Sequence, residues 1–527
     1  MRSASTKRYL SRRQPILARN VVATSQPLAA QAGLGIMARG GNAVDAALGS
    51  AIALTVVEPT SNGVGGDGFA QVWDGSALHG FNGSGRSPDA WTPDRFKGLE
   101  NMPDLGWDAV TVPGAVDLWV QLSERFGRID FEALFEPAVR YAREGFLVGP
   151  VTAAAWQEAA RKLQHQPGFA QTFLPGGRAP RVGEMFRNPG LAISLEEIAS
   201  TRGESFYRGG IAARIVAHSR AHGGVMSEHD LGDHRGMFVE PVSVDYRGYR
   251  VHELPPNGQG LAALIALGVL ARFELSGREV DGPDSLHLQI EAMRCGFDVA
   301  ARHVSDPETM TCDVADYLAE GFLADLASGI RLDGATALGP MSSRERGTVY
   351  LAAADADGRM VSLIQSNFHG FGSGVVVDES GISLHNRGSG FVLEAGHPNQ
   401  VGPRKRPFHT IIPGFLTRQG KPALAFGVMG AHMQPQGHVQ VLSRMLDHDQ
   451  GPQAALDAPR WRLTVTGELA LEDGVEPETR RALRNRGHPV VEGDPGLVFG
   501  AGQLVWRLDD GYCSASDPRK EGQAVGF

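Results

Sequence analysis

The stretch Arg344-Glu345-Arg346-Gly347-Thr348-Val349-Tyr350-Leu351-Ala352-Ala353-Ala354-Asp355 joins a charged approach to an apolar, β-branched run. A threonine hydroxyl is a weak nucleophile at neutral pH and needs a base beside it. The α-amine of Thr348, with a pKa of about 7.7–8.0 when free, becomes that base once the preceding peptide bond is broken. Gly347 suits such a bond because glycine adopts dihedrals that other residues avoid. We therefore interpret Thr348 as a nucleophile unmasked by cleavage between Gly347 and Thr348.

The same two residues also have an ordinary structural interpretation. Threonine favours the pleated surface of a sheet, so a Gly-Thr pair commonly opens a strand. Two strand patterns, Val349 to Ala354 and Met360 to Gln365, flank an Asp-Gly turn and predict a hairpin with Thr348 at its exposed start. On these residues alone, a nucleophile and a simple strand start both remain open.

The composition is that of an ordinary soluble globular protein, with 42% hydrophobic and 21% charged residues. At 527 residues the chain exceeds the size that one compact core usually supplies, although large single α/β units occur. A net charge of −9 and a pI near 6.0 give no electrostatic reason to expect nucleic acid or an anionic membrane. We expect neither as a partner.

Cysteine usage and the amino terminus bear on the compartment. Cys295, Cys312 and Cys513 are too few and too irregularly spaced for a disulfide framework or a zinc site. The basic segment from Met1 to Asn20 lacks the apolar core of a secretory signal. No run approaches the roughly 18 apolar residues that a membrane span needs. We therefore expect a cytoplasmic protein.

A glycine-rich octet, Ser61 to Gly68, contains the pattern G-x-G-x-x-G. The dinucleotide fingerprint requires a strand before these glycines and a helix after them. Here a helical pattern, Ala43 to Val57, comes first and a strand pattern, Phe69 to Trp73, follows. Because this order is reversed, we predict a loop in which backbone approaches backbone, and no nucleotide cofactor.

The predicted secondary structure changes along the chain from mainly helical to mainly extended. Leu326 to Thr348 is a glycine-punctuated connection that suits a processing loop. Beyond Thr348 strand signals dominate. Predicted helices comprise Leu28–Ala38, a helical region within Pro113–Leu163, Leu191–Ala199, Gly210–His222, a helix from Leu261, and Leu286–Arg302, with a hairpin at Val242–His252.

Known catalytic motifs do not account for this sequence. There is no H-E-x-x-H motif and no His, Cys or Asp set with metal-ligand spacing, so we predict no metal. There is no G-x-S-x-G elbow or Walker loop either. Gly430 and Ala431 stand between a predicted strand and a predicted helix, where backbone amides can stabilise an oxyanion; a tight turn is the alternative. Arg86, in a Gly/Ser turn, can bind a carboxylate or simply be solvated.

Several motifs occur in one order from about Val22 to near the carboxyl end. They are Gly40–Ala47, Glu58-Pro59 with Gly63–Gly68, Val112-Pro113-Gly114, Phe371–Gly374, Glu379–Ile382, Gly402-Pro403 with Lys405–Pro407, and Ser514–Arg519. Together they closely resemble the γ-glutamyltransferase family of amino-terminal nucleophile hydrolases. The resemblance implies an α+β fold, an αββα sandwich of two stacked antiparallel sheets. It also implies a proenzyme that cuts itself into residues 1–347 and 348–527, which stay together, and leaves open a dimer of such pairs.

Carried over position by position, the resemblance implies catalytic roles. Thr348 stands at the nucleophile. Ser366 stands where the family has a second threonine that hydrogen-bonds the nucleophile, so a hydroxyl is kept. Gly430 and Ala431 occupy the paired-glycine turn whose amides form the oxyanion hole, and alanine also has an N–H. No cofactor is implied.

The substrate pocket departs from the family pattern. Gly390 replaces an aspartate that accepts the substrate's α-ammonium, and His409 and Thr410 replace paired serines. The asparagine that helps hold the α-carboxylate corresponds to Phe368 or, with a slip of one residue, to Asn367.

Two arginines are candidates for a substrate carboxylate. Arg86 lies two residues before its proline, whereas the family's carboxylate-binding arginine lies four before. Arg387, close to Gly390 in sequence, favours a substrate with a carboxylate and no ammonium, because a buried charge needs a partner.

We therefore expect an amidohydrolase that releases a small acid through an acyl-enzyme on Thr348. Its pocket resembles the oxamate amidohydrolase branch, which converts oxamate to oxalate and ammonia; glutaryl-type acylases are another such branch. A true γ-glutamyltransferase or glutathione hydrolase is the alternative, with Glu394 as the closest acid to Gly390. An uncleaved, non-catalytic binding protein of the same fold is a third.

Overall fold

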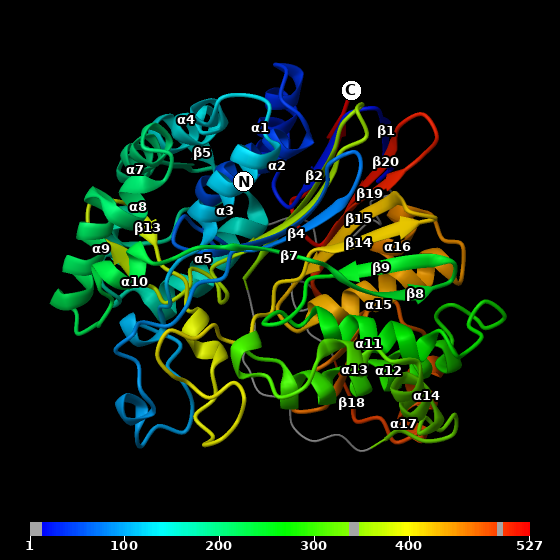
Figure 1. Cartoon of the computed structure of the whole chain (residues 1–527). Helices are drawn as coiled ribbons and strands as arrows, with labels where there is room; N and C mark the ends of the chain where they lie inside the picture. Colours follow the sequence, from blue (N-terminus) through cyan, green and yellow to red (C-terminus); the bar gives the residue numbers. More distant parts are fainter. Residues whose placement is uncertain (1–12, 337–346, 493–498) are drawn as a thin grey trace.

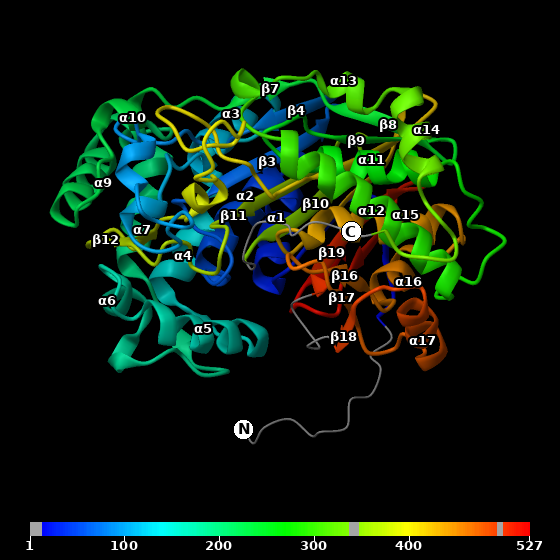
Figure 2. The same cartoon turned by 90° about the horizontal axis from the view of Figure 1, so that it is seen from below.

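Two seven-stranded sheets stack on each other in the computed structural model, which describes residues 13–336, 347–492 and 499–527 (Figure 1). All strand pairs within both sheets are antiparallel. The helices of residues 27–232 gather on the side of one sheet and those of residues 260–485 on the side of the other (Figures 1 and 2). The expected αββα sandwich is therefore confirmed.

The first sheet, in spatial order, comprises β21 (Gln523–Gly526), β2 (Val21–Thr24), β10 (Val349–Ala354), β11 (Met360–Ser366), β3 (Asp67–Trp73), β4 (Leu78–Asn82) and β7 (Met237–Val239). The second comprises β1 (Ile16–Ala18), β20 (Tyr512–Ser516), β19 (Ala501–Arg507), β15 (Lys421–Met429), β14 (Gly414–Arg418), β9 (Tyr249–Glu253) and β8 (Val242–Tyr246). Both sheets contain strands from before and from after Thr348.

The helices over the first sheet are α1 (Pro27–Ala38), α2 (Ala43–Val57), α3 (Ala115–Phe126), α4 (Glu136–Glu144), α5 (Pro150–Leu163), α6 (Phe169–Phe173), α7 (Pro189–Ser200), α8 (Glu204–Arg208), α9 (Gly210–Ala221) and α10 (Glu228–Gly232). Those over the second are α11 (Gly260–Leu270), α12 (Pro283–His303), α13 (Val314–Tyr317), α14 (Glu320–Ser328), α15 (Met433–Leu446), α16 (Pro452–Asp457) and α17 (Pro477–Asn485). Small sheets pair β5 (Phe146–Leu147) with β6 (Met185–Phe186), β12 (Val376–Val377) with β13 (Ile382–Ser383), and β16 (Trp461–Leu463) with β17 (Leu469–Leu471) and β18 (Val490–Glu492).

Strand β10 shows how the layers are held together. Successive side chains of a strand point to opposite faces. Val349, Leu351 and Ala353 pack toward the α1–α10 layer, whereas Tyr350, Ala352 and Ala354 pack between the two sheets. A Cβ at Gly427 of β15 would meet Tyr350 Cδ2 at 2.4 Å, so the glycine lets this ring fit between the sheets. The apolar run after Thr348 is thus buried on both faces.

Helix α2 agrees with its predicted bounds for a local reason. The Asn42 side chain accepts from Val44 N and Asp45 N, and Asp45 accepts from Asn42 N, which forms a capping box. All residues of α2 are buried. The helix ends before Pro59, which cannot continue it.

The structure corrects several sequence expectations. Turn residues dominate the sequence between Pro167 and Gly190 and predict a loop there, but the structure has the short helix α6 and strand β6 in this stretch. The sequence also predicts strands at Gly374 to Val377 and Ile382 to Leu384, and each of the strands found there, β12 and β13, is only two residues long. Leu326, the predicted start of the processing loop, lies inside α14, and residues 337–346 of that loop lie outside the described residues.

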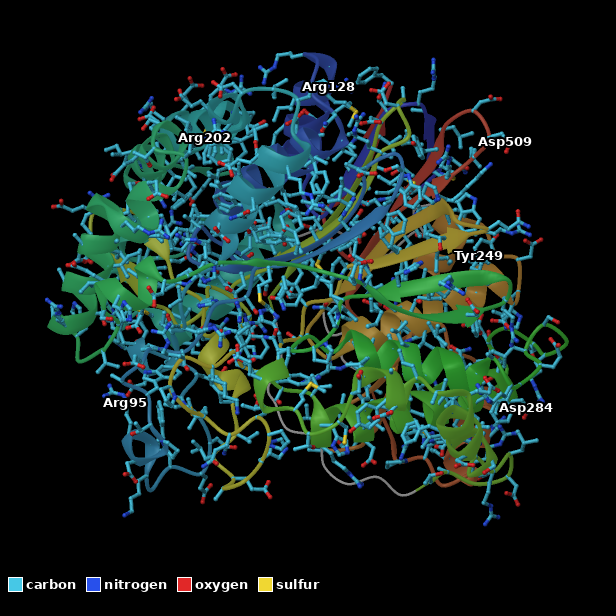
Figure 3. The ribbon with its side chains drawn as sticks, viewed as in Figure 1. Arg95, Arg128, Arg202, Tyr249, Asp284 and Asp509 are labelled. Atoms are coloured by element: carbon cyan, nitrogen blue, oxygen red, sulfur yellow. The ribbon has the colours of Figure 1, made fainter. Side chains whose placement is uncertain are left out.

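Charged side chains labelled around the edge of the molecule include Arg95, Arg128, Arg202, Asp284 and Asp509 (Figure 3). Arg128, for example, pairs with Asp357 at 2.5 Å while half exposed. None of the helices among the described residues has the length and hydropathy to cross a membrane. Against this pattern, the fully buried charges described below need a separate explanation.

Candidate functional site

Thr348 lies at the start of β10, buried, in the wall of a cavity of about 290 Å³. Its Oγ1 donates to Gly347 O at 2.5 Å and lies 3.1 Å from Ser366 Oγ. Ser366, the last residue of β11, also donates to Gly347 O at 2.8 Å. Two hydroxyls therefore converge on the carbonyl of the predicted scissile bond, where negative charge would develop during attack.

Gly347 has a backbone that only glycine accepts easily. Its φ is +111°, and a Cβ there would meet Gly370 N at 2.4 Å and Phe368 O at 2.7 Å. The residue before Thr348 is thus pressed against the backbone of residues 368–370. This close approach explains a glycine at the predicted cleavage site better than a need for flexibility alone.

We expect Ser366→Ala to slow maturation. The variant removes one of the two hydroxyls on Gly347 O, and the loss of a single oxyanion donor costs roughly 10²–10³ in rate. The appearance of two fragments on a denaturing gel over time measures it. Ser362→Ala, on the same strand and bonded to Tyr350 Oη at 2.8 Å, is the matched control. Equal rates for both variants would remove Ser366 from the reaction.

Gly430 and Ala431 follow β15 and precede α15. Both have positive φ, +121° and +50°. Gly430 O accepts from Met433 N at 2.8 Å and Ala431 O from Gln434 N at 3.1 Å, so both carbonyls point into the helix. Their N–H groups precede a helix N-terminus, where amides favour negative charge. Gly430 lines the same cavity as Thr348. The oxyanion-hole role of the pair stays a prediction that this arrangement suits.

Arg387 is a buried charged residue whose guanidinium makes few hydrogen bonds. Its side chain is fully buried, and Nη1 donates to Thr410 Oγ1 at 3.0 Å. The guanidinium carbon lies 4.2 Å from the Phe368 ring centroid. Nε and Nη2 have no hydrogen-bond partner among the described residues. Burial lowers the pKa of Arg387 to about 9, so the group keeps its charge near neutral pH.

Asp67 balances that charge at a distance. Its Oδ2 lies 3.9 Å from Arg387 Nε, 3.4 Å from His385 Nδ1 and 3.0 Å from His409 Nε2, while Oδ1 accepts from Gly114 N at 3.1 Å. Burial opposes ionisation, but His385 and His409 outweigh it and hold the pKa of Asp67 well below its ordinary value. Burial and Arg387 lower the pKa of His409 to about 3, so His409 is neutral and donates to Asp67.

Sequence reasoning missed Asp67 and His385. Asp67 was treated as part of a glycine loop, although an acid in front of a buried strand was a usable signal. His385 gave no signal. His409 and Asn367 are both predicted to bind substrate. They line neither the Thr348 cavity nor a neighbouring cavity of about 670 Å³. Asn367 instead donates to Ser383 Oγ at 3.2 Å, against the glycine loop.

The structure does not bring Arg86 to Thr348. Its guanidinium lies 2.7 Å from Glu308 Oε1 and 3.3 Å from Asp306 Oδ2, and it donates to Arg404 O at 2.7 Å. Arg86 lines a separate cavity of about 260 Å³, whose described wall does not include Thr348. Because two carboxylates already occupy this arginine, we do not place it in the substrate pocket.

A larger cavity, of about 670 Å³, shares His369 with the Thr348 cavity. Phe368, Gly390 and Thr410 line it, so it gathers several of the positions predicted for the substrate. Of the two candidates for the family's asparagine, Phe368 lines this cavity and Asn367 does not.

Two groups of side chains among the described residues have the types and spacing to hold a metal. They are His218, His222 and Asp378, and His287, Glu291 and His488. Neither group lines the Thr348 cavity. Trp107 Nε1 donates to His218 Nδ1 at 3.3 Å, and His287 and His488 bond each other at 2.8 Å. Both groups therefore have existing hydrogen-bond roles apart from the nucleophile.

Residues 29–527 match the family model described as gamma-glutamyltranspeptidase. The chain is 37% identical over 521 residues to the glutathione hydrolase-like YwrD proenzyme of Bacillus subtilis (strain 168), covering 97% of this chain and 98% of the relative. It is 34% identical to the oxamate amidohydrolase proenzyme of Klebsiella pneumoniae, covering 95% and 97%. The crystal structure of a cephalosporin acylase from Bacillus halodurans superposes with a TM-score of 0.95 at 45% identity, covering 100% and 99%.

Proposed function

This chain belongs to the gamma-glutamyltranspeptidase family and is a hydrolase that acts on amides, and from that premise we propose that it matures by self-cleavage between Gly347 and Thr348. The fragments would be residues 1–347 and 348–527, held together as one unit. The convergence of the Thr348 and Ser366 hydroxyls on Gly347 O carries this proposal. The proenzyme names of two relatives support it.

The mature reaction then follows from the new terminus. The free α-amine of Thr348 takes the proton of its own hydroxyl, and Oγ1 attacks the amide carbonyl carbon of the substrate. The amine leaves with that proton, and an ester on Thr348 remains. Water attacks the ester, gives one proton back to Oγ1, and releases the acid. The Gly430 and Ala431 amides would stabilise the oxyanion of both steps.

We propose further that the acyl part of the substrate carries a carboxylate. Arg387 supports this, because a buried guanidinium with two unpartnered nitrogens binds a planar carboxylate well. Oxamate is the smallest such amide and our preferred example, in line with the name of one relative. Arg387 does not itself line the larger cavity, but it contacts Phe368 and Thr410, which do.

A γ-glutamyltransferase or glutathione hydrolase is the second candidate. One observation favours it: Glu394 lines the larger cavity together with Gly390, so an acid is available for an α-ammonium. The name of the other relative is consistent with it.

Substrate profiling of the mature protein separates the two candidates. We expect ammonia release from oxamate and weak release of p-nitroaniline from γ-glutamyl-p-nitroanilide. Robust glutamyl turnover without ammonia from oxamate would reverse the preference. A single band near 56 kDa from fresh, inactive protein would instead favour the non-catalytic alternative.

A further inference from the structure

The cavity of about 670 Å³ is larger than a two-carbon acid requires. Pockets of 300–1,000 Å³ are typical for ligands of drug-like size. Its apolar wall comes from separate segments and includes Met102, Phe297, Val304, Phe391, Leu393 and Phe408. Such a wall offers hydrophobic contact to a ring or a branched chain.

In the uncleaved chain, Gly347 shows where an acyl group attached to Thr348 would begin. Gly347 is the acyl part of the bond that Thr348 attacks first, so it occupies the place of a substrate acyl group. It is pressed against Phe368 O and Gly370 N. His369, between these two residues, lines both cavities. Gly347 lines the smaller cavity with Thr348, so an acyl group longer than a glycine residue would pass His369 to reach the larger cavity.

His369 is held ready to contact such a group. Asn386 fixes it twice, by Oδ1 accepting from His369 N at 3.0 Å and by Nδ2 donating to His369 Nδ1 at 3.2 Å. The ring stacks on Phe368 with centroids 3.8 Å apart. Nδ1 also lies 3.5 Å from Asp104 Oδ1. In the tautomer in which Nδ1 accepts from Asn386, the proton is on Nε2. That nitrogen is buried and has no partner among the described residues.

We propose that the larger cavity is the acyl subsite, that it prefers carboxylate-bearing acyl groups with an apolar, ring-sized body, and that His369 Nε2 donates a hydrogen bond to them. This assignment rests on the proposed function and specifies which acyl groups the site prefers. It places the apolar body against Phe297, Phe391 and Phe408. The carboxylate lies toward Phe368 and Thr410, which cover Arg387, and the scissile carbonyl lies at Thr348 in the smaller cavity.

Two matched substrates test the subsite without any mutation. Glutaryl-p-nitroanilide and 3-phenylglutaryl-p-nitroanilide differ only by one phenyl ring. We expect the phenyl compound to have a kcat/KM at least tenfold higher. Equal or lower values for the phenyl compound would overturn the assignment while oxamate or glutaryl turnover kept the proposed function intact. The absence of turnover of every amide would overturn both.

Variants locate the effect. Ala300→Phe, on α12 in the cavity wall, should lower kcat/KM more for the phenyl compound than for the glutaryl compound and so abolish the phenyl advantage. Ala213→Phe, on the exposed side of α9, is the matched control and should keep the advantage. His369→Phe should lower kcat/KM tenfold for both substrates, and His369→Gln, which keeps an N–H donor, should restore most of it. Equal loss in both His369 variants, with processing intact, would remove the hydrogen bond from the proposal.

Discussion

Thr348→Ala should accumulate as one uncut chain, close to the 56.2 kDa of the full sequence, with no detectable amide hydrolysis. Without the hydroxyl, nothing at this position can attack Gly347 O=C, and no free α-amine is generated. The Ser366 hydroxyl also bonds to Gly347 O, at 2.8 Å, so cleavage of this variant at the same bond would point to Ser366 as the attacking hydroxyl. A denaturing gel, intact mass and an amide assay measure the outcome.

Thr348→Ser is the matched control, because it keeps a hydroxyl on the same backbone. It should mature and retain activity, with a new terminus that begins Ser-Val-Tyr. In the wild type the corresponding terminus begins Thr-Val-Tyr. Cleavage of the alanine variant, or a wild-type terminus elsewhere, would show that another residue is the nucleophile.

Arg387→Gln should raise the KM for an acid substrate by roughly 30- to 1,000-fold while maturation continues. Removing one partner of a buried charge pair costs about 2–4 kcal/mol. Arg387 contacts Thr410 Oγ1 and the Phe368 ring, whereas Gly347 lies against the backbone of Phe368 and Gly370, so we expect maturation to continue. Steady-state kinetics on oxamate, beside a gel for processing, gives both readouts.

Two further variants interpret that result. Arg387→Lys keeps the charge but lacks the planar fork, so its KM should fall between those of the wild type and the glutamine variant. Arg250→Gln, on an exposed arginine paired with Asp245, should leave KM unchanged. A normal KM in Arg387→Gln would take this arginine out of the pocket.

The sequence carried the local parts of this fold well. The hairpin after Thr348 and helices α1, α2 and α12 were predicted within a few residues, because capping residues, prolines and apolar periodicity act over short distances. The glycine octet was predicted to be a close backbone approach. A Cβ at Gly65 would indeed meet Ser383 O at 2.4 Å.

The parts that failed depend on contacts distant in sequence. Arg86 has the right residue type in the right kind of turn, but Asp306 and Glu308, more than 200 residues away, take up its charge. Asp67 lies over 300 residues from Arg387 and His409. No spacing rule predicts such pairs, because they form only when segments distant in sequence fold together.

Both sheets combine strands from before and after Thr348, so cleavage at Gly347 would change how the protein refolds after denaturation. In the first sheet β2 lies between β21 and β10, and in the second β1 pairs with β20. Cleavage after Gly347 would therefore leave two fragments joined through shared sheets. Once unfolded, these fragments would have to associate again to refold, so refolding would become bimolecular and would depend on protein concentration. At low protein concentration, thermal denaturation would then be irreversible for the cleaved form and reversible for the intact precursor.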